Sequence, residues 1–132
     1  GGTAPFVVGF CMGGSQALIT GTHAGLELAG IVAFYAGLSR NLGGGTVLEQ
    51  AVNSQYPVLG LFGGADTSIP PEQLQELDAN LDRAGVPHTI VSYPGAPHSF
   101  FDRKAVEFAA ESADAWQRVL AFIAQPQAAQ PA

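Results

Sequence analysis

The sequence contains one cysteine, Cys11, among its 132 residues. A single thiol cannot form an internal disulfide, and it cannot build a metal site that needs several cysteines. An unpaired thiol is typical of a reducing compartment. We therefore expect a cytoplasmic protein without a multi-cysteine metal site. We also expect its chemistry to need neither a metal ion nor an organic cofactor.

Positive charge is also scarce. The chain has five Lys and Arg against eleven Asp and Glu, which gives a net charge of −6 without any acidic run. Neutralising several phosphates requires a basic patch. We therefore expect no nucleic-acid partner and no binding to an anionic membrane surface.

Long apolar runs are missing as well. Glycine, proline and polar residues interrupt each apolar stretch well short of the length that crosses a bilayer. No basic segment precedes an apolar one near the start, so we expect no signal peptide in this sequence. The chain begins at Gly1 without a methionine, and we expect it to continue a longer polypeptide.

What remains is an apolar composition, with 47% hydrophobic and 12% charged residues, which indicates a buried, sheet-centred core. Strand-length apolar runs alternate with stretches of helical periodicity, which predicts an α/β domain with a mainly parallel sheet flanked by helices. The predicted strands are residues 6–10, 30–35, 57–62 and 88–93, and the predicted helices are 16–23, 70–84 and 105–124. The last helix is expected to have one apolar side, made of Ala115, Trp116, Val119, Leu120 and Ile123. We assign residues 1–124 to one domain and residues 125–132 to a disordered, low-complexity tail.

The most informative segment is Gly9-Phe10-Cys11-Met12-Gly13, which runs from the end of the first predicted strand into the turn before the first helix. A reactive side chain between two glycines at such a turn is typical of a nucleophile elbow. The glycines predict a turn too tight for side chains, and the helix N-terminus beyond it favours a thiolate. The Met12 backbone N–H would be one donor to an oxyanion. Alternatively, Cys11 is a small core residue and the glycines serve only close packing.

Two further polar residues follow predicted strands at the same edge of the sheet. Asp66 comes just after the third strand and His98 just after the fourth. Ligands of open parallel sheets bind beyond the carboxyl ends of the strands. Asp66 alone could stabilise a turn, and His98 could be an ordinary loop histidine. The chain order of nucleophile, acid and histidine favours a catalytic set of Cys11, Asp66 and His98.

These motifs resemble the dienelactone hydrolase (carboxymethylenebutenolidase) family of α/β-hydrolases. The resemblance covers about residues 6–123 and rests on these motifs: Gly9-Phe10-Cys11-Met12-Gly13-Gly14, Gly63-Gly64-Ala65-Asp66 with Ile69-Pro70, Pro94-Gly95-Ala96 with His98-Ser99-Phe100, and Asp114-Ala115-Trp116 with Arg118. It implies the C-terminal portion of an α/β-hydrolase fold, in which the N-terminal strands are missing. It also implies a small-molecule enol-lactone or activated ester as substrate, cleaved through a Cys-His-Asp triad and a thioester.

The resemblance implies two further features. The first strand would be an interior strand whose other neighbour belongs to an N-terminal half that this chain needs. The family places a carboxylate-binding arginine shortly after its histidine, and here Arg103 follows His98 without a clear assignment. The alternatives are a non-catalytic binding domain of the same fold, a relative of the serine esterases with a different substrate range, and a thiol redox sensor.

Overall fold

The sheet of the computed structural model has four strands, all parallel, in the order β1-β2-β3-β4. The structure describes residues 4–98, 101 and 106–124, so the predicted tail at 125–132 lies outside the described residues. The strands are Phe6–Phe10 (β1), Gly30–Phe34 (β2), Val58–Gly63 (β3) and His88–Tyr93 (β4). Every residue of β2 and β3 is buried, as expected for parallel strands that are covered on both faces.

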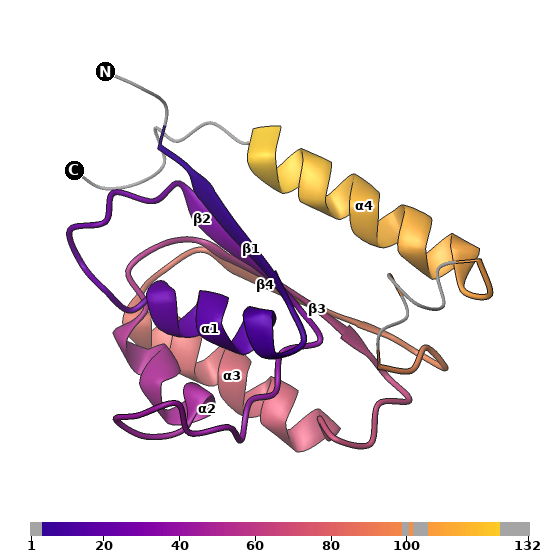
Figure 1. Cartoon of the computed structure of the whole chain (residues 1–132), viewed down its shortest axis with the longest axis horizontal. Helices are drawn as coiled ribbons and strands as arrows, with labels where there is room; N and C mark the ends of the chain where they lie inside the picture. Colours follow the sequence, from indigo (N-terminus) through magenta and orange to yellow (C-terminus); the bar gives the residue numbers. More distant parts are fainter. Residues whose placement is uncertain (1–3, 99–100, 102–105, 125–132) are drawn as a thin grey trace.

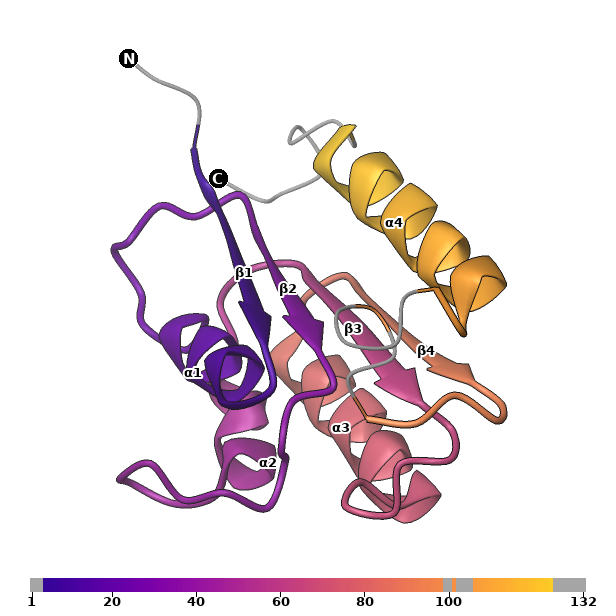
Figure 2. The same cartoon turned by 45° about the vertical axis from the view of Figure 1, so that its right-hand side comes forward.

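The helices cover the sheet from both sides. They are Met12–Thr20 (α1), Val47–Gln50 (α2), Pro71–Ala84 (α3) and Ala109–Ala124 (α4), with a short 3₁₀ helix at Ala51–Asn53. Figures 1 and 2 show α1, α2 and α3 against one face of the sheet and α4 alone on the opposite face. The predicted α/β class with a parallel sheet is confirmed. Within the described ranges, none of the helices is long and apolar enough to cross a membrane.

The predicted helix boundaries at two places were wrong. Helix α1 begins at Met12 rather than Gln16, because the tight turn at Cys11 leads directly into the helix. Helix α4 begins at Ala109 rather than Ala105, after a turn over residues 106–108. The earlier start of α1 matters for the site, since it places the N-terminus of that helix immediately after the cysteine.

The face that α4 turns toward the sheet differs in part from the prediction. Of the predicted apolar side, Ala115 and Val119 are buried, but Trp116, Leu120 and Ile123 are between 43% and 48% exposed. The buried row is Ser112, Ala115, Val119 and Phe122. The ring of Phe122 packs edge-on against Phe6 of β1, with centroids 5.6 Å apart, and this contact helps to fix the rotation of the helix.

Strand β1 lies at an edge of the described sheet, with β2 as its only neighbour there. Its side chains Val8 and Phe10 are 45% and 40% exposed. The outer edge of this strand has no partner strand among the described residues, and such an edge pairs readily with another strand. This strand also carries the chain into the turn at Cys11.

Candidate active site

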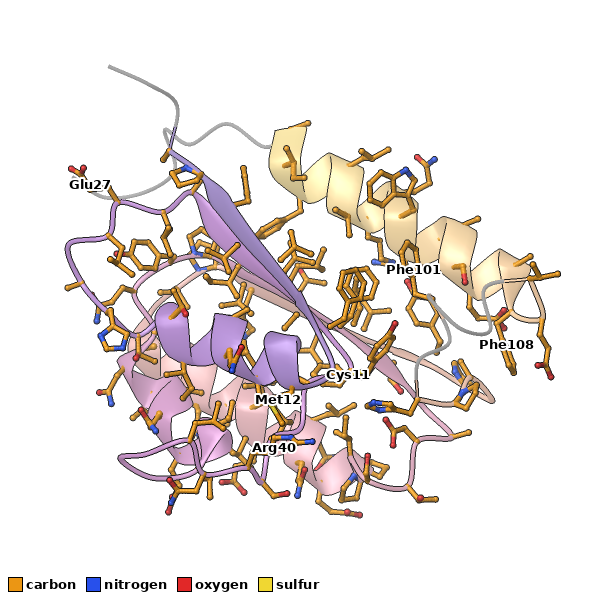
Figure 3. The ribbon with its side chains drawn as sticks, in the orientation of Figure 1. Cys11, Met12, Glu27, Arg40, Phe101 and Phe108 are labelled. Atoms are coloured by element: carbon orange, nitrogen blue, oxygen red, sulfur yellow. The ribbon has the colours of Figure 1, made fainter. Side chains whose placement is uncertain are left out.

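Cys11 occupies a strained turn between β1 and α1. Its backbone has φ 56° and ψ −120°, a left-handed conformation that non-glycine residues rarely adopt. The Cys11 N–H donates to the carbonyl of Phe34 at the end of β2, at 3.1 Å, and the Ser15 N–H donates to the Cys11 carbonyl at 3.2 Å. Strain held by such contacts is characteristic of functional sites. The turn presents the thiol beyond the carboxyl end of the sheet (Figure 3).

The two glycines that flank this turn have different roles. A Cβ on Gly9 would lie 2.0 Å from the Gly13 carbonyl oxygen and 2.7 Å from the Gly14 nitrogen, so only glycine fits there. A Cβ on Gly13 would meet no described atom within 4 Å outside the backbone of its own helix. The sequence therefore predicted the crowded turn correctly at Gly9, but the requirement at Gly13 was wrong.

The loops that follow β3 and β4 are held against each other. The Ala65 N–H donates to the carbonyl of Ala96 at 3.0 Å, and the Gly64 N–H donates to that of Tyr93 at 2.7 Å. A Cβ on Gly63 would lie 2.3 Å from the Ala96 oxygen, so the close approach of the loops requires glycine at that position. These contacts bring Asp66 and His98, which are 32 positions apart in sequence, to one place.

The side chains of Cys11, Asp66 and His98 form a connected row. His98 Nδ1 lies 2.6 Å from Asp66 Oδ2, and His98 Nε2 lies 3.2 Å from Cys11 Sγ. Because a carboxylate can only accept, the proton belongs on Nδ1, and the lone pair of Nε2 then faces the thiol. The three residues that sequence reasoning singled out thus lie within hydrogen-bonding distance in the order that nucleophile activation requires.

Asp66 is buried, whereas its histidine partner is not. The Asp66 side chain is 4% exposed and that of His98 is 40% exposed. Burial alone would raise the pKa of Asp66. Hydrogen bonds from the Ser68 hydroxyl, His98 and the Ser68 backbone together outweigh burial, so the pKa of Asp66 lies below its ordinary value. The carboxylate is therefore ionised and able to stabilise a positive imidazole.

A cavity of about 220 Å³ opens in front of the thiol. It is lined by Cys11, Tyr35, Gly37, Ser39, Arg40, Ser68 and His98. Figure 3 labels Arg40 in the same region as Cys11 and Met12. Of these lining residues, sequence reasoning had identified only Cys11 and His98.

Tyr35 and Arg40 follow β2 at the carboxyl edge of the sheet, and that position was the available signal for them. Tyr35 is fully buried, has φ 38°, and its ring centroid lies 5.0 Å from that of His98. The Arg40 guanidinium is exposed and forms no ion pair or side-chain hydrogen bond with the described residues. This cation beside the cavity gives the site a positive side.

Met12 begins α1 directly after Cys11. The first N–H groups of a helix have no acceptor within the helix, and the first bond of α1 runs from Ser15 to Cys11. The Met12 N–H thus lies at the positive end of the helix, as the sequence led us to expect. Arg103, for which the sequence gave no clear role, lies outside the described residues.

A parallel sheet covered on both faces, a strained cysteine before a helix, and Asp66 and His98 on the loops after two later strands define an α/β-hydrolase fold. Known structures agree. The chain superposes on a Pyrococcus horikoshii acylaminoacyl peptidase with a TM-score of 0.71 over 89% of this chain, at 14% identity, which shows the fold alone.

The family follows from closer relatives. The model of the dienelactone hydrolase family matches residues 5–126, so the chain belongs to this family. It is 36% identical over 126 residues to a candidate carboxymethylenebutenolidase from Yersinia pestis, covering 90% of this chain and 46% of that protein. The resemblance inferred from the motifs is confirmed.

Solved structures of dienelactone hydrolase-like proteins are similar to this structure. The crystal structure of a candidate dienelactone hydrolase from Klebsiella pneumoniae has a TM-score of 0.77 at 32% identity, over 92% of this chain and 52% of that one. A dienelactone hydrolase-like promiscuous phosphotriesterase from metagenomic libraries has a TM-score of 0.70 at 25% identity, over 89% and 50%. The chain thus spans about half the length of the relatives it matches.

Proposed function

We propose that this chain supplies the nucleophile, acid and base of a hydrolase that cleaves an enol-lactone or activated ester through Cys11, His98 and Asp66. The observation that carries the proposal is the continuous row of contacts, 2.6 Å from Asp66 to His98 and 3.2 Å from His98 to Cys11. Membership of the dienelactone hydrolase family supports the substrate class.

The first half of the reaction forms a thioester. His98 Nε2 takes the proton of the Cys11 thiol, and Asp66 stabilises the resulting imidazolium through Nδ1. The thiolate attacks the substrate carbonyl, and the Met12 N–H donates to the oxygen that gains negative charge. When the tetrahedral intermediate collapses, the ester C–O bond breaks. The leaving oxygen carries away the bond electrons and receives the proton from His98, either as the bond breaks or, for an enolate, before water attacks the thioester.

The second half releases the acid. His98, neutral again, takes a proton from a water molecule that attacks the thioester carbonyl. The C–S bond then breaks, and the thiol recovers a proton from His98. Each proton that leaves sulfur or water therefore passes through one imidazole, which explains why His98 has to contact the thiol on one side and the carboxylate on the other.

Substituting the nucleophile tests this proposal. We expect Cys11→Ala to abolish hydrolysis of a p-nitrophenyl ester and of a lactone by the full-length protein, while substrate binding remains. Rapid acid quench followed by mass spectrometry should detect the acyl adduct on the parent protein and none on Cys11→Ala. Thr20→Ala, on the far end of the same helix, is the matched control and should retain full activity. Retained turnover by Cys11→Ala would refute the assignment.

The alternatives give different results in the same assays. A non-catalytic binding domain would bind the lactone without turnover or adduct. A redox sensor would show oxidation of Cys11 but no ester hydrolysis, and the absence of a second cysteine in this chain disfavours it. A relative with a different substrate range would hydrolyse simple esters and reject lactones, which a panel of both classes distinguishes.

Arg40 supports an anionic group on the substrate. Its guanidinium lines the cavity with Cys11 and has no partner among the described residues. An unpaired guanidinium favours a carboxylate, which it can bind through two hydrogen bonds. The substrate panel should therefore include matched neutral and carboxylate-bearing esters, and Arg40→Gln should raise KM for the second kind alone.

We also propose that an N-terminal half completes the sheet and the site. The unpaired edge of β1, the exposed Val8 and Phe10, and the half-length match to relatives support it. That half would supply a second oxyanion donor. We expect residues 1–132 alone to aggregate or to lack activity, whereas an active, monodisperse preparation would contradict this.

The lone thiol favours the cytoplasm as the compartment.

A further inference from the structure

We propose that Ser68 is a positioning residue, which orients Asp66 so that the carboxylate can hold His98. This inference rests on the proposed function of the same site. Ser68 lies two residues after Asp66, in the turn that precedes α3. Its side chain lines the cavity together with Cys11 and His98.

The contacts of the carboxylate divide between its two oxygens. Asp66 Oδ1 accepts from the Ser68 hydroxyl at 2.5 Å and from the Ser68 N–H at 3.0 Å. Asp66 Oδ2 contacts His98 Nδ1 at 2.6 Å. With one oxygen held by two donors from the turn, the carboxylate cannot rotate about its terminal bond without breaking them. The other oxygen is thereby fixed toward the imidazole.

Burial makes this support necessary. The Asp66 side chain is only 4% exposed, so solvent provides little stabilisation of its charge. The hydroxyl of Ser68 has a single proton, and in this geometry it goes to the carboxylate. The Ser68 hydroxyl and N–H also contribute to the lowered pKa of Asp66, which keeps the carboxylate ionised while it supports the imidazolium.

A matched pair of serines makes the proposal testable. Ser54 is buried outside this cavity and makes no hydrogen bond to Asp66, so Ser54→Ala removes an equal hydroxyl without affecting the carboxylate. We expect Ser68→Ala to lower kcat about tenfold, the loss typical of a hydrogen bond to a charged group, with KM nearly unchanged. Ser54→Ala should leave kcat unchanged. Ser68→Thr, which restores the hydroxyl, should recover most of the activity.

The pH profile separates positioning from a merely structural role. Without the hydroxyl, the pKa of Asp66 rises, because a hydrogen bond that lowers it is lost. The acidic limb of kcat/KM should then move to higher pH in Ser68→Ala but not in Ser54→Ala. A structural defect would lower the amount of active protein, measured by titration of the Cys11 thiol, without moving the limb.

Two outcomes overturn different claims. If Ser68→Ala matches Ser54→Ala in kcat and in pH profile while Cys11→Ala is inactive, the role of Ser68 is refuted and the proposed hydrolase remains. If Cys11→Ala retains activity, the proposed function itself fails. Recovery of activity by Ser68→Thr with the normal acidic limb would support the positioning role.

Discussion

Gly9 and Gly13, on either side of the Cys11 turn, should respond differently to substitution, because they differ in the space available for a side chain. A Cβ on Gly9 would lie 2.0 Å from the Gly13 oxygen, whereas ordinary contacts begin at 3.4 Å. At least 1.4 Å of separation, the difference of those distances, would have to be created between two backbone segments. Neither segment yields easily, since backbone hydrogen bonds hold Cys11 to Phe34 and to Ser15.

The cost follows from this geometry. Overpacking usually destabilises a protein by about 1–3 kcal/mol when side chains can adjust. Here the obstacle is backbone, so we expect Gly9→Ala to lower the free energy of unfolding by about 3 kcal/mol or more. In a full-length protein of about twice this length, that corresponds to a fall in Tm of roughly 6 to 12 °C. Activity should be lost as well, because the turn that aims the thiol would open.

Gly13→Ala provides the matched control. Its Cβ meets nothing described within 4 Å outside its own helix, and alanine favours a helix over glycine. We expect this variant to be stable to within about 1 kcal/mol of the parent, on the favourable side. Urea unfolding of both variants, followed by circular dichroism, measures the difference. Equal destabilisation by the two substitutions would refute the reasoning about the turn.

Two further predictions concern the acid and the contact between β4 and α4. The lowered pKa of Asp66 means that the ionised carboxylate stabilises the fold fully above its ordinary pKa of 3.8, and that this stabilisation is lost as pH falls through the lower pKa of the folded state. We therefore expect the free energy of unfolding of Asp66→Asn to depend less on pH than that of the parent below about pH 4. Parallel curves of unfolding free energy against pH would contradict this. The Tyr93 hydroxyl donates to Asp114 Oδ2 at 2.6 Å, and the Asp114 side chain is half exposed. We expect Tyr93→Phe to lower the free energy of unfolding by about 1 kcal/mol, because solvent weakens a hydrogen bond to an exposed charge. An unchanged Tm in thermal unfolding would exclude the contact as a stabilising one.

The sequence was most informative where a local pattern has a single structural meaning. The apolar run of β1, the glycine at position 9 and the helix after it define a tight turn whatever the rest of the chain does. The alternation of strands and helices then fixes a parallel sheet, since short connections through helices allow little else. Polar residues after successive strands necessarily meet at one edge, which is why Cys11, Asp66 and His98 could be predicted as a group.

The sequence was least informative where the rotation of a helix or the contacts of a loop determine which side chains reach the core or the site. The apolar residues of α4 allow more than one inward face, and packing of Phe122 on Phe6 selects the one in which Trp116 remains exposed. In the sequence, no motif distinguishes Arg40 from the other residues of its loop. Only the cavity shows that its guanidinium lies near the thiol.

By itself, then, the sequence determined the fold class and the three side chains at the edge of the sheet, because periodicity and strand order depend on neighbouring residues along the chain. The tertiary structure decided that the turn needs glycine at Gly9 and not at Gly13, and that Ser68 holds Asp66. These facts depend on small differences in the distances between segments that fold against each other, and no pattern of residue types records such distances.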